Sequence, residues 1–313
     1  MLAESAQLKR QIPLSKIESL VLFGRIGLSA YVINYLLEES IPVTWLSNTG
    51  RYYGRLDCTT HINIERQRLQ FRFSEDESFR LELSKRFILG KISNQIVLLR
   101  RYNREREKQK VREIIVKIAA LRENSQRVSD IKQAAGCEGM CARLYFEALS
   151  MLIDRDISFS GRSRRPPEDK FNSMLSFGYT LMMYEVYNAI ELRGLNPYAA
   201  FLHKDRTGHP ALASDLMEEW RPVIVDSLAM SLANTHEIKP EHFYEAENAG
   251  IYLTDAGRRV FLDKFEKRIR RDHKYTNNEF SMNFRQSVLS QVTALCSALE
   301  NKDASLYKPV IIR

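Results

Sequence analysis

Beyond about residue 78, hydrophobic residues recur at intervals of three and four, which is the spacing of one face of an α-helix. The pattern predicts amphipathic helices over residues 79–103 and 111–121, and a helix that is apolar on nearly all sides over residues 171–192. Further helices are predicted over residues 140–152, 214–233, 254–271 and 283–299. Pro222 is expected to perturb the helix that contains it, because proline lacks the N–H that continues a helix.

The N-terminal part of the chain has a different pattern. Short runs rich in β-branched and aromatic residues predict strands over residues 12–17, 19–23, 41–46 and 52–56. A short helix is predicted over residues 29–38, with Ser29 as its N-cap. The polar segment 62–78 separates the two patterns. We therefore expect an α+β protein, with a small β-rich domain over residues 1–70 and a larger all-α domain over residues 71–313.

Charge and composition narrow the class of protein. Lys and Arg outnumber Asp and Glu by 47 to 39, a net charge of +8 that favours a polyanionic partner without requiring one. No apolar run reaches the roughly 18 residues of a membrane span, and the N-terminus lacks a signal-peptide core, so we expect a cytoplasmic protein away from membranes. The four cysteines form no C-x-x-C pattern, and we expect reduced, buried thiols.

Residues 200–222 concentrate side chains that could bind a metal. His203 lies in a loop marked by glycine and proline, and Asp215 and Glu218 are three residues apart, on one face of a predicted helix. Carboxylates with one imidazole suit Mg²⁺ or Mn²⁺ better than zinc. A structural explanation is also open: with Ser214 as N-cap, both carboxylates would lie in the first turn and favour the helix dipole.

Glu138 is a further acidic candidate, because it lies among glycines at the predicted start of the helix over residues 140–152. There it could reach into a cleft, or it could simply face the helix N-terminus. Together with His203, Asp215 and Glu218 it supplies the side chains that hold divalent ions against a phosphodiester. The sequence contains no P-loop, no G-x-G-x-x-G, no H-E-x-x-H and no plausible G-x-S-x-G triad.

Several arginines could bind phosphate. Arg162, Arg164 and Arg165 fall within four residues and are followed by two prolines, which makes a compact cationic loop. Residues 100–106 and 264–274 are also rich in basic side chains. Each of these runs is either a phosphate contact or a solvated face, and the sequence leaves both interpretations open.

Several segments resemble the CRISPR-associated integrase and endonuclease family of spacer acquisition. The N-terminal segments I-P-L-S-K-I-E-S-L-V-L-F-G and V-T-W-L-S-N-T-G-R-Y-Y-G-R-L resemble parts of its β-domain, and G-R-S-R-R-P-P-E-D-K-F-N-S-M-L resembles its signature loop and central helix. G-C-E-G-M-C-A-R-L-Y-F, F-L-H and D-L-M-E-E-W-R-P resemble the segments that carry its metal ligands. These matches occur in the family's order and cover most of the chain.

The resemblance implies an N-terminal β-sandwich-like domain that forms a homodimer, and a helical, metal-dependent catalytic domain. It also implies a complex with the small ferredoxin-like CRISPR-associated adaptation protein. The implied reaction joins the 3′-hydroxyl of a double-stranded DNA fragment to the leader–repeat junction of a CRISPR array, with nuclease activity at the same site. The alternatives are a metal-dependent nuclease of repair or recombination that is not tied to an array, and a non-catalytic DNA-binding scaffold.

The resemblance also assigns residue roles. Glu138, His203 and Glu218 match the ligands of Mg²⁺ or Mn²⁺, and Asp215 matches a carboxylate that supports the metal or orients the attacking group. Arg162, Arg164, Arg165 and Arg221 are the candidate phosphate contacts. Family members usually begin with two or three more strands before the segment that starts at Ile12 here. We therefore expect either an incomplete N-terminal sheet or a misassigned start codon.

Overall fold

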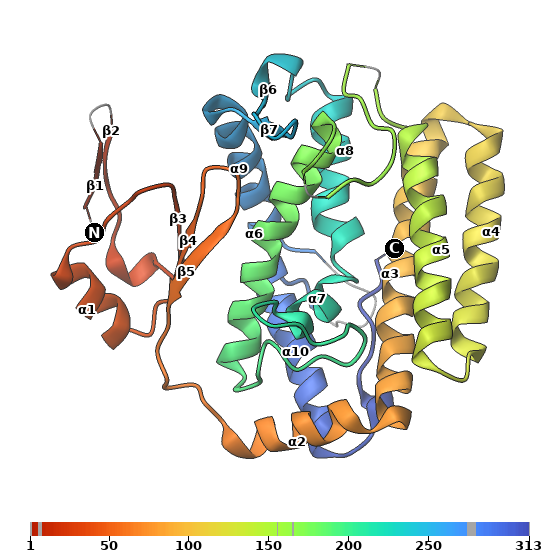
Figure 1. The fold of residues 1–313 in the computed structure, drawn as a ribbon, viewed down its shortest axis with the longest axis horizontal. Coiled ribbons are helices and arrows are strands. Elements are labelled where there is room, and N and C mark those ends of the chain that lie inside the picture. The colour runs from red at the N-terminus through yellow and green to blue at the C-terminus, as the bar shows by residue number, and fades with distance from the viewer. Residues whose placement is uncertain (1, 6–7, 155, 165, 274–279, 313) are drawn as a thin grey trace. The chain divides into compact units, whose positions relative to one another are not determined.

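The computed structural model describes residues 2–5, 8–154, 156–164, 166–273 and 280–312. The chain forms two compact units, Met1–Ile62 and Asn63–Arg313 (Figure 1). Within the described residues, the first unit contains short strands and one α-helix, and the second is mostly helical. This arrangement confirms the predicted α+β class, with a small strand-containing region before a larger helical one.

The described part of the first unit forms two small sheets. In the first sheet β1 (Leu2–Ser5) pairs antiparallel with β2 (Leu8–Gln11). In the second sheet β3 (Leu20–Phe23) runs parallel to β4 (Val43–Leu46), which pairs antiparallel with β5 (Tyr52–Leu56). The strand predicted over residues 12–17 is wrong. The chain forms a single 3₁₀ turn at Leu14–Lys16 just after Pro13, whose ring restricts the backbone.

Helix α1 (Ala30–Glu38) provides the crossover from β3 to the parallel strand β4. As predicted, Ser29 caps this helix, and its hydroxyl accepts a hydrogen bond from the Val32 N–H at 3.4 Å. Leu36 of α1 and Val43 and Leu46 of β4 are fully buried, so they form the core of this unit. The strand, helix and strand therefore share one small hydrophobic core.

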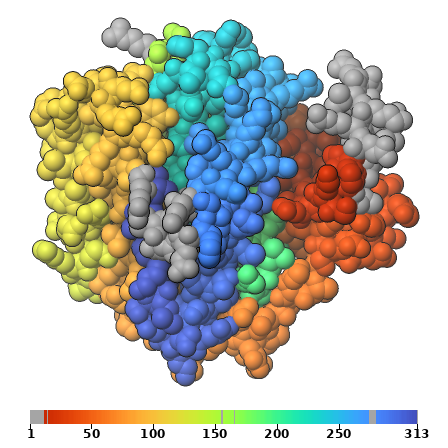
Figure 2. All heavy atoms as spheres, turned by 180° about the vertical axis from the view of Figure 1, so that it is seen from behind, coloured from red at the N-terminus to blue at the C-terminus, as the bar shows by residue number. Residues whose placement is uncertain are grey.

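The second unit is built from nine α-helices and a short β-hairpin within the described residues. The helices are α2 (Ile64–Glu75), α3 (Glu77–Arg106), α4 (Gln109–Arg127), α5 (Ile131–Ser150), α6 (Lys170–Leu192), α7 (Ala211–Met217), α8 (Ser227–Asn234), α9 (Asp255–Arg270) and α10 (Phe284–Glu300). The hairpin pairs β6 (Phe243–Glu245) with β7 (Ile251–Leu253). Seen from behind, α9 and α10 cover the middle of this unit, with the layer of α3, α4 and α5 to one side (Figure 2).

The longest element is α3, whose 30 residues span about 45 Å. It begins where the Asp76 carboxylate accepts a hydrogen bond from the Phe79 N–H at 2.9 Å, and it ends at Glu107, which has a left-handed backbone (φ +47°). Leu83, Phe87 and Ile92 are fully buried along it. Helices α4 and α5 pack against one side of α3 and the C-terminal segment packs against another, so α3 has neighbours on both sides (Figure 1).

The segment after α6 departs from the helix predicted over residues 214–233. Helix α7 begins earlier, at Ala211 after Pro210, so Ser214 is not an N-cap. As predicted, the helix is perturbed at Pro222, where a π-helical segment, Arg221–Asp226, connects α7 to α8. Gly178 of α6 allows close packing here, because a Cβ at this position would lie 2.6 Å from Val225 Cγ1.

No helix in the described part of the chain combines the length and hydrophobicity needed to cross a membrane. All four cysteines are free thiols, with Cys141 and Cys296 buried and Cys58 and Cys137 partly exposed. The prediction of buried thiols therefore holds for two of the four.

Candidate metal centre

Glu138 lies within α5, about two turns beyond the first residue, Ile131. The prediction that it opens a helix is wrong, because α5 is capped upstream by Asp130, which accepts a hydrogen bond from the Gln133 N–H at 2.8 Å. Added Cβ atoms at Gly136 and Gly139 would meet no atom within 4 Å. The Glu138 side chain is 26% exposed, so it is accessible to a bound ion or substrate.

Asp215 and His203 form one hydrogen-bonded unit. The buried Asp215 carboxylate accepts hydrogen bonds from the backbone N–H groups of Phe201, Leu202 and His203 at 2.7–2.9 Å. It also lies 2.6 Å from His203 Nδ1, and because a carboxylate accepts, the ring N–H is placed on Nδ1. This tautomer leaves the lone pair on His203 Nε2, the nitrogen that faces Glu218 at 3.7 Å.

The Glu218 carboxylate is buried, with a side chain only 3% exposed, and it is surrounded by positive charge. Arg221 Nη1 lies 2.8 Å from one oxygen and Lys91 Nζ lies 2.6 Å from the other. Burial would raise the pKa of Glu218, but the charges of Arg221 and Lys91 lower it to about 2. Glu218 lies beyond the end of α7, so the interpretation that it favours a helix N-terminus is wrong.

Lys91 is the residue of this centre that the sequence analysis missed. Its ammonium contacts Glu138 Oε1 as well as Glu218 Oε2, although the two glutamates come from different elements. Burial alone would lower the pKa of Lys91, but the two carboxylates raise it. The sequence contains one signal that could have found it: Lys91 follows the apolar run F-I-L-G and precedes Ile92, so apolar residues flank it on both sides. A lysine in such a run requires a buried partner.

The donor set at this centre fits a divalent cation. Glu138 Oε1 and Glu218 Oε2 both contact the Lys91 ammonium, and His203 Nε2 lies 3.7 Å from the other oxygen of Glu218, although the ligand atoms of these three residues do not all lie within 4.8 Å of one another. Glu218 Oε2 is a buried oxygen whose partner among the described residues is the Lys91 ammonium at 2.6 Å, a cation at the place where an ion would bind. Oxygen ligands with one imidazole are the set expected for Mg²⁺ or Mn²⁺.

A buried aspartate that accepts hydrogen bonds from two tyrosines lies next to the centre. Tyr145 of α5 and Tyr179 of α6 each donate a hydrogen bond to one oxygen of Asp226, at 2.7 and 2.5 Å. Burial raises the pKa of Asp226 to about 6, even though the two hydroxyl donors act in the opposite direction. Asp226 therefore ties α5 and α6 to the π-helical segment that begins at Arg221.

The candidate phosphate-binding arginines occupy different environments. The guanidinium groups of Arg162 and Arg221 both lie over the ring of Tyr179, at 5.4 and 5.0 Å from its centroid. Arg162 also donates a hydrogen bond to Asn172 Oδ1 at 2.8 Å. Arg164 is exposed on the loop, and Arg165 lies outside the described residues. The structure therefore brings Arg162 and Arg221 together beside one tyrosine.

A separate acidic group was not predicted. Within the described residues, ligand atoms of Asp154, Asp156 and His236 all lie within 4.8 Å of one another. The first residue of this group, Asp154, lies just beyond Ser150, the last residue of α5. Glu138 lies about 18 Å earlier along the same helix, so this group is separate from the centre that contains Glu138. It is partly exposed to solvent, with the His236 side chain 54% accessible.

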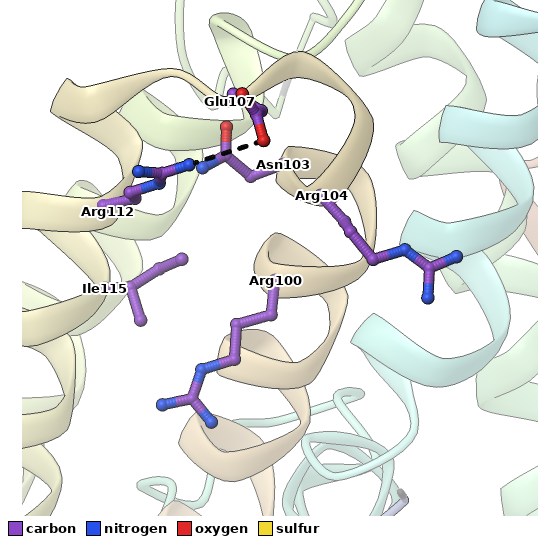
Figure 3. Close-up of a pocket in the computed structure, with 6 residues that line it drawn as sticks. All are labelled: Arg100, Asn103, Arg104, Glu107, Arg112 and Ile115. Carbon is purple, nitrogen blue, oxygen red and sulfur yellow. Dashed lines mark ion pairs between the residues drawn. The ribbon is translucent and has the colours of Figure 1, made fainter.

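A basic hollow of about 410 Å³ lies where α3 ends and α4 begins (Figure 3). It is lined by Arg100, Asn103, Arg104, Glu107, Arg112 and Ile115. Arg112 lies 3.9 Å from Glu107, while Arg100 and Arg104 project from successive turns of α3. Arg100 and Arg104 of the basic run over residues 100–106 are exposed to solvent, as expected both for a phosphate contact and for a solvated face.

Comparisons with known proteins show which family and fold the chain is similar to. A family model described as CRISPR associated protein Cas1 matches residues 1–267. A CRISPR-associated endonuclease Cas1 of Rhodospirillum rubrum is 36% identical over 278 residues, which cover 85% of this chain and 80% of that protein. The structure of a CAS1 protein from Thermotoga maritima has a TM-score of 0.82 at 21% identity and covers 96% of this chain and 91% of that chain. A chain of a partial Cas6-RT-Cas1–Cas2 complex has a TM-score of 0.71 at 25% identity, covering 96% of this chain and 90% of that chain.

Proposed function

The chain belongs to the Cas1 family of CRISPR-associated proteins, and from this premise we propose that Glu138, His203 and Glu218 bind its divalent cation. The protein is a CRISPR adaptation endonuclease and integrase, which inserts DNA fragments into the CRISPR array. The observation that carries the metal proposal is the convergence of the two carboxylates on one cation position, with His203 Nε2 3.7 Å from Glu218.

When bound, the Mg²⁺ or Mn²⁺ ion would neutralise the phosphodiester and help to align the attacking oxygen with it. The two glutamates would hold the ion from opposite elements, and His203 would present Nε2. Asp215 would keep the histidine in the required tautomer through its hydrogen bond to Nδ1. We assign Asp215 this supporting role because its oxygens already accept three backbone N–H groups and the ring N–H.

The arginines would bind the DNA backbone. Arg221 and Arg162 carry two positive charges at the edge of the centre, where they can offset the charge of phosphate oxygens. Arg164 and Arg165 belong to the same loop as Arg162 and are proposed as further phosphate contacts. Planar guanidinium groups suit this task because they can donate two parallel hydrogen bonds.

The protein acts with DNA and with protein partners. We propose that residues 1–70 form a homodimer interface and that residues 71–313 form the catalytic domain. We further propose a complex with the small ferredoxin-like adaptation protein, a proposal supported by the similarity to a chain of a partial Cas6-RT-Cas1–Cas2 complex. The cytoplasmic location remains a prediction. Size-exclusion chromatography with light scattering tests the dimer, since removal of residues 1–62 should leave a monomer.

The test of the metal proposal is strand transfer with Mn²⁺ and a branched, half-integrated DNA substrate. Glu138→Ala, His203→Ala and Glu218→Ala should each abolish strand transfer while DNA binding in a gel-shift assay is largely kept. Lys85→Ala, which removes a charge on the same helix as Lys91 at a residue paired with Glu82 at 2.9 Å, serves as a variant that should keep the reaction. Full activity in the three alanine variants would overturn the proposed centre and leave only the family assignment.

A further inference from the structure

We propose that Lys91 is a built-in counter-ion that occupies the cation position between Glu138 and Glu218 and competes with the divalent ion for it. The inference rests on the proposed function, because it takes both glutamates as metal ligands. It assigns Lys91 a positioning role: in the absence of ion it holds the two carboxylates together, and it limits how tightly an ion binds.

The first support is the placement of the ammonium group. It contacts Glu138 Oε1 and lies 2.6 Å from Glu218 Oε2, so one positive charge joins two side chains that are 80 positions apart in the sequence. The Lys91 side chain is only 8% exposed, and therefore solvent screens these pairs weakly. Two carboxylates that meet at one point repel each other unless a cation lies between them.

The second support is the rigidity of the helix that carries Lys91. Gly90 lies so close to the segment after α7 that a Cβ there would be 2.8 Å from Glu219 Cγ. One turn beyond, the Asn94 amide donates hydrogen bonds to the carbonyls of Glu219 and Val310, at 2.8 and 2.9 Å. These contacts fix the backbone of Lys91 opposite Glu218. Only its four-carbon side chain can move when an ion enters.

The formal charges of the residues at this centre determine whether replacing Lys91 strengthens or weakens binding of the divalent ion. The formal charges of Glu138, Asp215 and Glu218 sum to −3, and those of Lys91 and Arg221 to +2, so with neutral His203 the centre carries −1. A divalent ion that enters must displace the ammonium from the carboxylates or bind against its repulsion. Replacing Lys91 with a neutral side chain changes the formal charge to −2 and removes the competitor. Arg221 stays paired with Glu218, which keeps the buried carboxylate from being left alone.

The test is a Mn²⁺ titration of the purified full chain without DNA, in which free Mn²⁺ is measured by electron paramagnetic resonance. Lys91→Met should bind Mn²⁺ about tenfold or more tightly than the wild type. Lys91→Arg keeps the charge and should bind no more tightly than the wild type. Lys85→Met is the matched control, because Lys85 is on the same helix but pairs with Glu82 at 2.9 Å. Its Mn²⁺ affinity should equal that of the wild type.

Two further variants separate the possible failures. If Lys91→Met does not fold without ion, Lys91→Gln takes its place with the same expected result. Glu138→Gln should weaken Mn²⁺ binding. If it does so while neither neutral Lys91 variant binds more tightly, the role of Lys91 is overturned and the proposed centre stands. If Glu138→Gln binds Mn²⁺ like the wild type, the proposed centre fails, and the inference about Lys91 fails with it.

Discussion

Substitution of Asp226 by asparagine tests how the buried network beside the centre contributes to stability. The folded protein raises the pKa of Asp226 from 3.8 to about 6, because burial disfavours the charged carboxylate. The folded state therefore binds a proton more tightly than the unfolded state does. The contribution of this group to the free energy of unfolding is greatest below pH 3.8 and is lost as the pH rises toward 6.

The size of the stability loss at higher pH follows from the shift in the pKa of Asp226. One unit of pKa corresponds to about 1.4 kcal/mol, so the wild type should lose roughly 2–3 kcal/mol from Asp226 between about pH 4 and pH 7. The asparagine side chain of the variant would not titrate. The hydroxyls of Tyr145 and Tyr179 would still meet a polar side chain, so that the cost of the changed hydrogen bonds is nearly independent of pH. The stability of Asp226→Asn relative to the wild type should therefore rise by roughly 2–3 kcal/mol over that range.

Urea unfolding at several pH values measures this difference. The chain has two tryptophans, and Trp220 is fully buried in the larger unit. A Trp45→Phe background removes the fluorescence of the first unit, which leaves Trp220 to report on the unit that contains Asp226. Parallel stability curves for the two proteins from pH 4 to pH 7 would refute the reasoning, because they would show that Asp226 titrates alike in the folded and unfolded states.

Three further predictions follow from particular contacts. Gly178→Ala should lower the free energy of unfolding by about 1–3 kcal/mol, because the new Cβ would lie 2.6 Å from Val225 Cγ1. Gly136→Ala should raise the free energy of unfolding by roughly 0.5–1 kcal/mol, because its new Cβ would face open space in a helix. Urea unfolding that ranks the two variants in the reverse order would contradict the packing. Asp215→Asn should weaken Mn²⁺ binding about 10–100-fold through loss of the His203 tautomer, and an unchanged affinity would remove its supporting role. If about 6–10 phosphates are bound, DNA affinity should fall roughly 10³–10⁵-fold between 50 and 200 mM salt. If Arg100 and Arg104 both bind phosphate, replacing both with glutamine should lower the slope of log affinity against log salt concentration by about 2. A wild-type affinity that does not change with salt would contradict polyanion binding.

Much of the helical fold could be predicted from periodicity, because long amphipathic segments repeat their signal many times. The elements α3, α4, α6 and α10 lie within a few residues of their predicted bounds, apart from the longer C-terminal end of α4. Helix α2 was taken for a polar boundary, because its packing depends on tertiary contacts: Gln70 is fully buried and donates hydrogen bonds to the carbonyls of Asn196 and Ala199. No local pattern encodes such contacts.

The candidate site could be predicted only in part. The types and order of residues in three segments pointed to Glu138, His203 and Glu218, but the start of α5 was misplaced because Gly136 and Gly139 were interpreted as a helix boundary. Both glycines lie inside the helix, where their positions face open space. Lys91 was missed because its role arises from two partners on other elements, and a lysine in an amphipathic helix ordinarily faces solvent.

The most direct test of the central claim is an anomalous diffraction map from crystals of the protein soaked in Mn²⁺. The account predicts a peak at metal–ligand bonding distance from the Glu138 and Glu218 carboxylates and from His203 Nε2, with the Lys91 ammonium moved away from the carboxylates. A map with no peak there, or with manganese only at Asp154, Asp156 and His236, would contradict it.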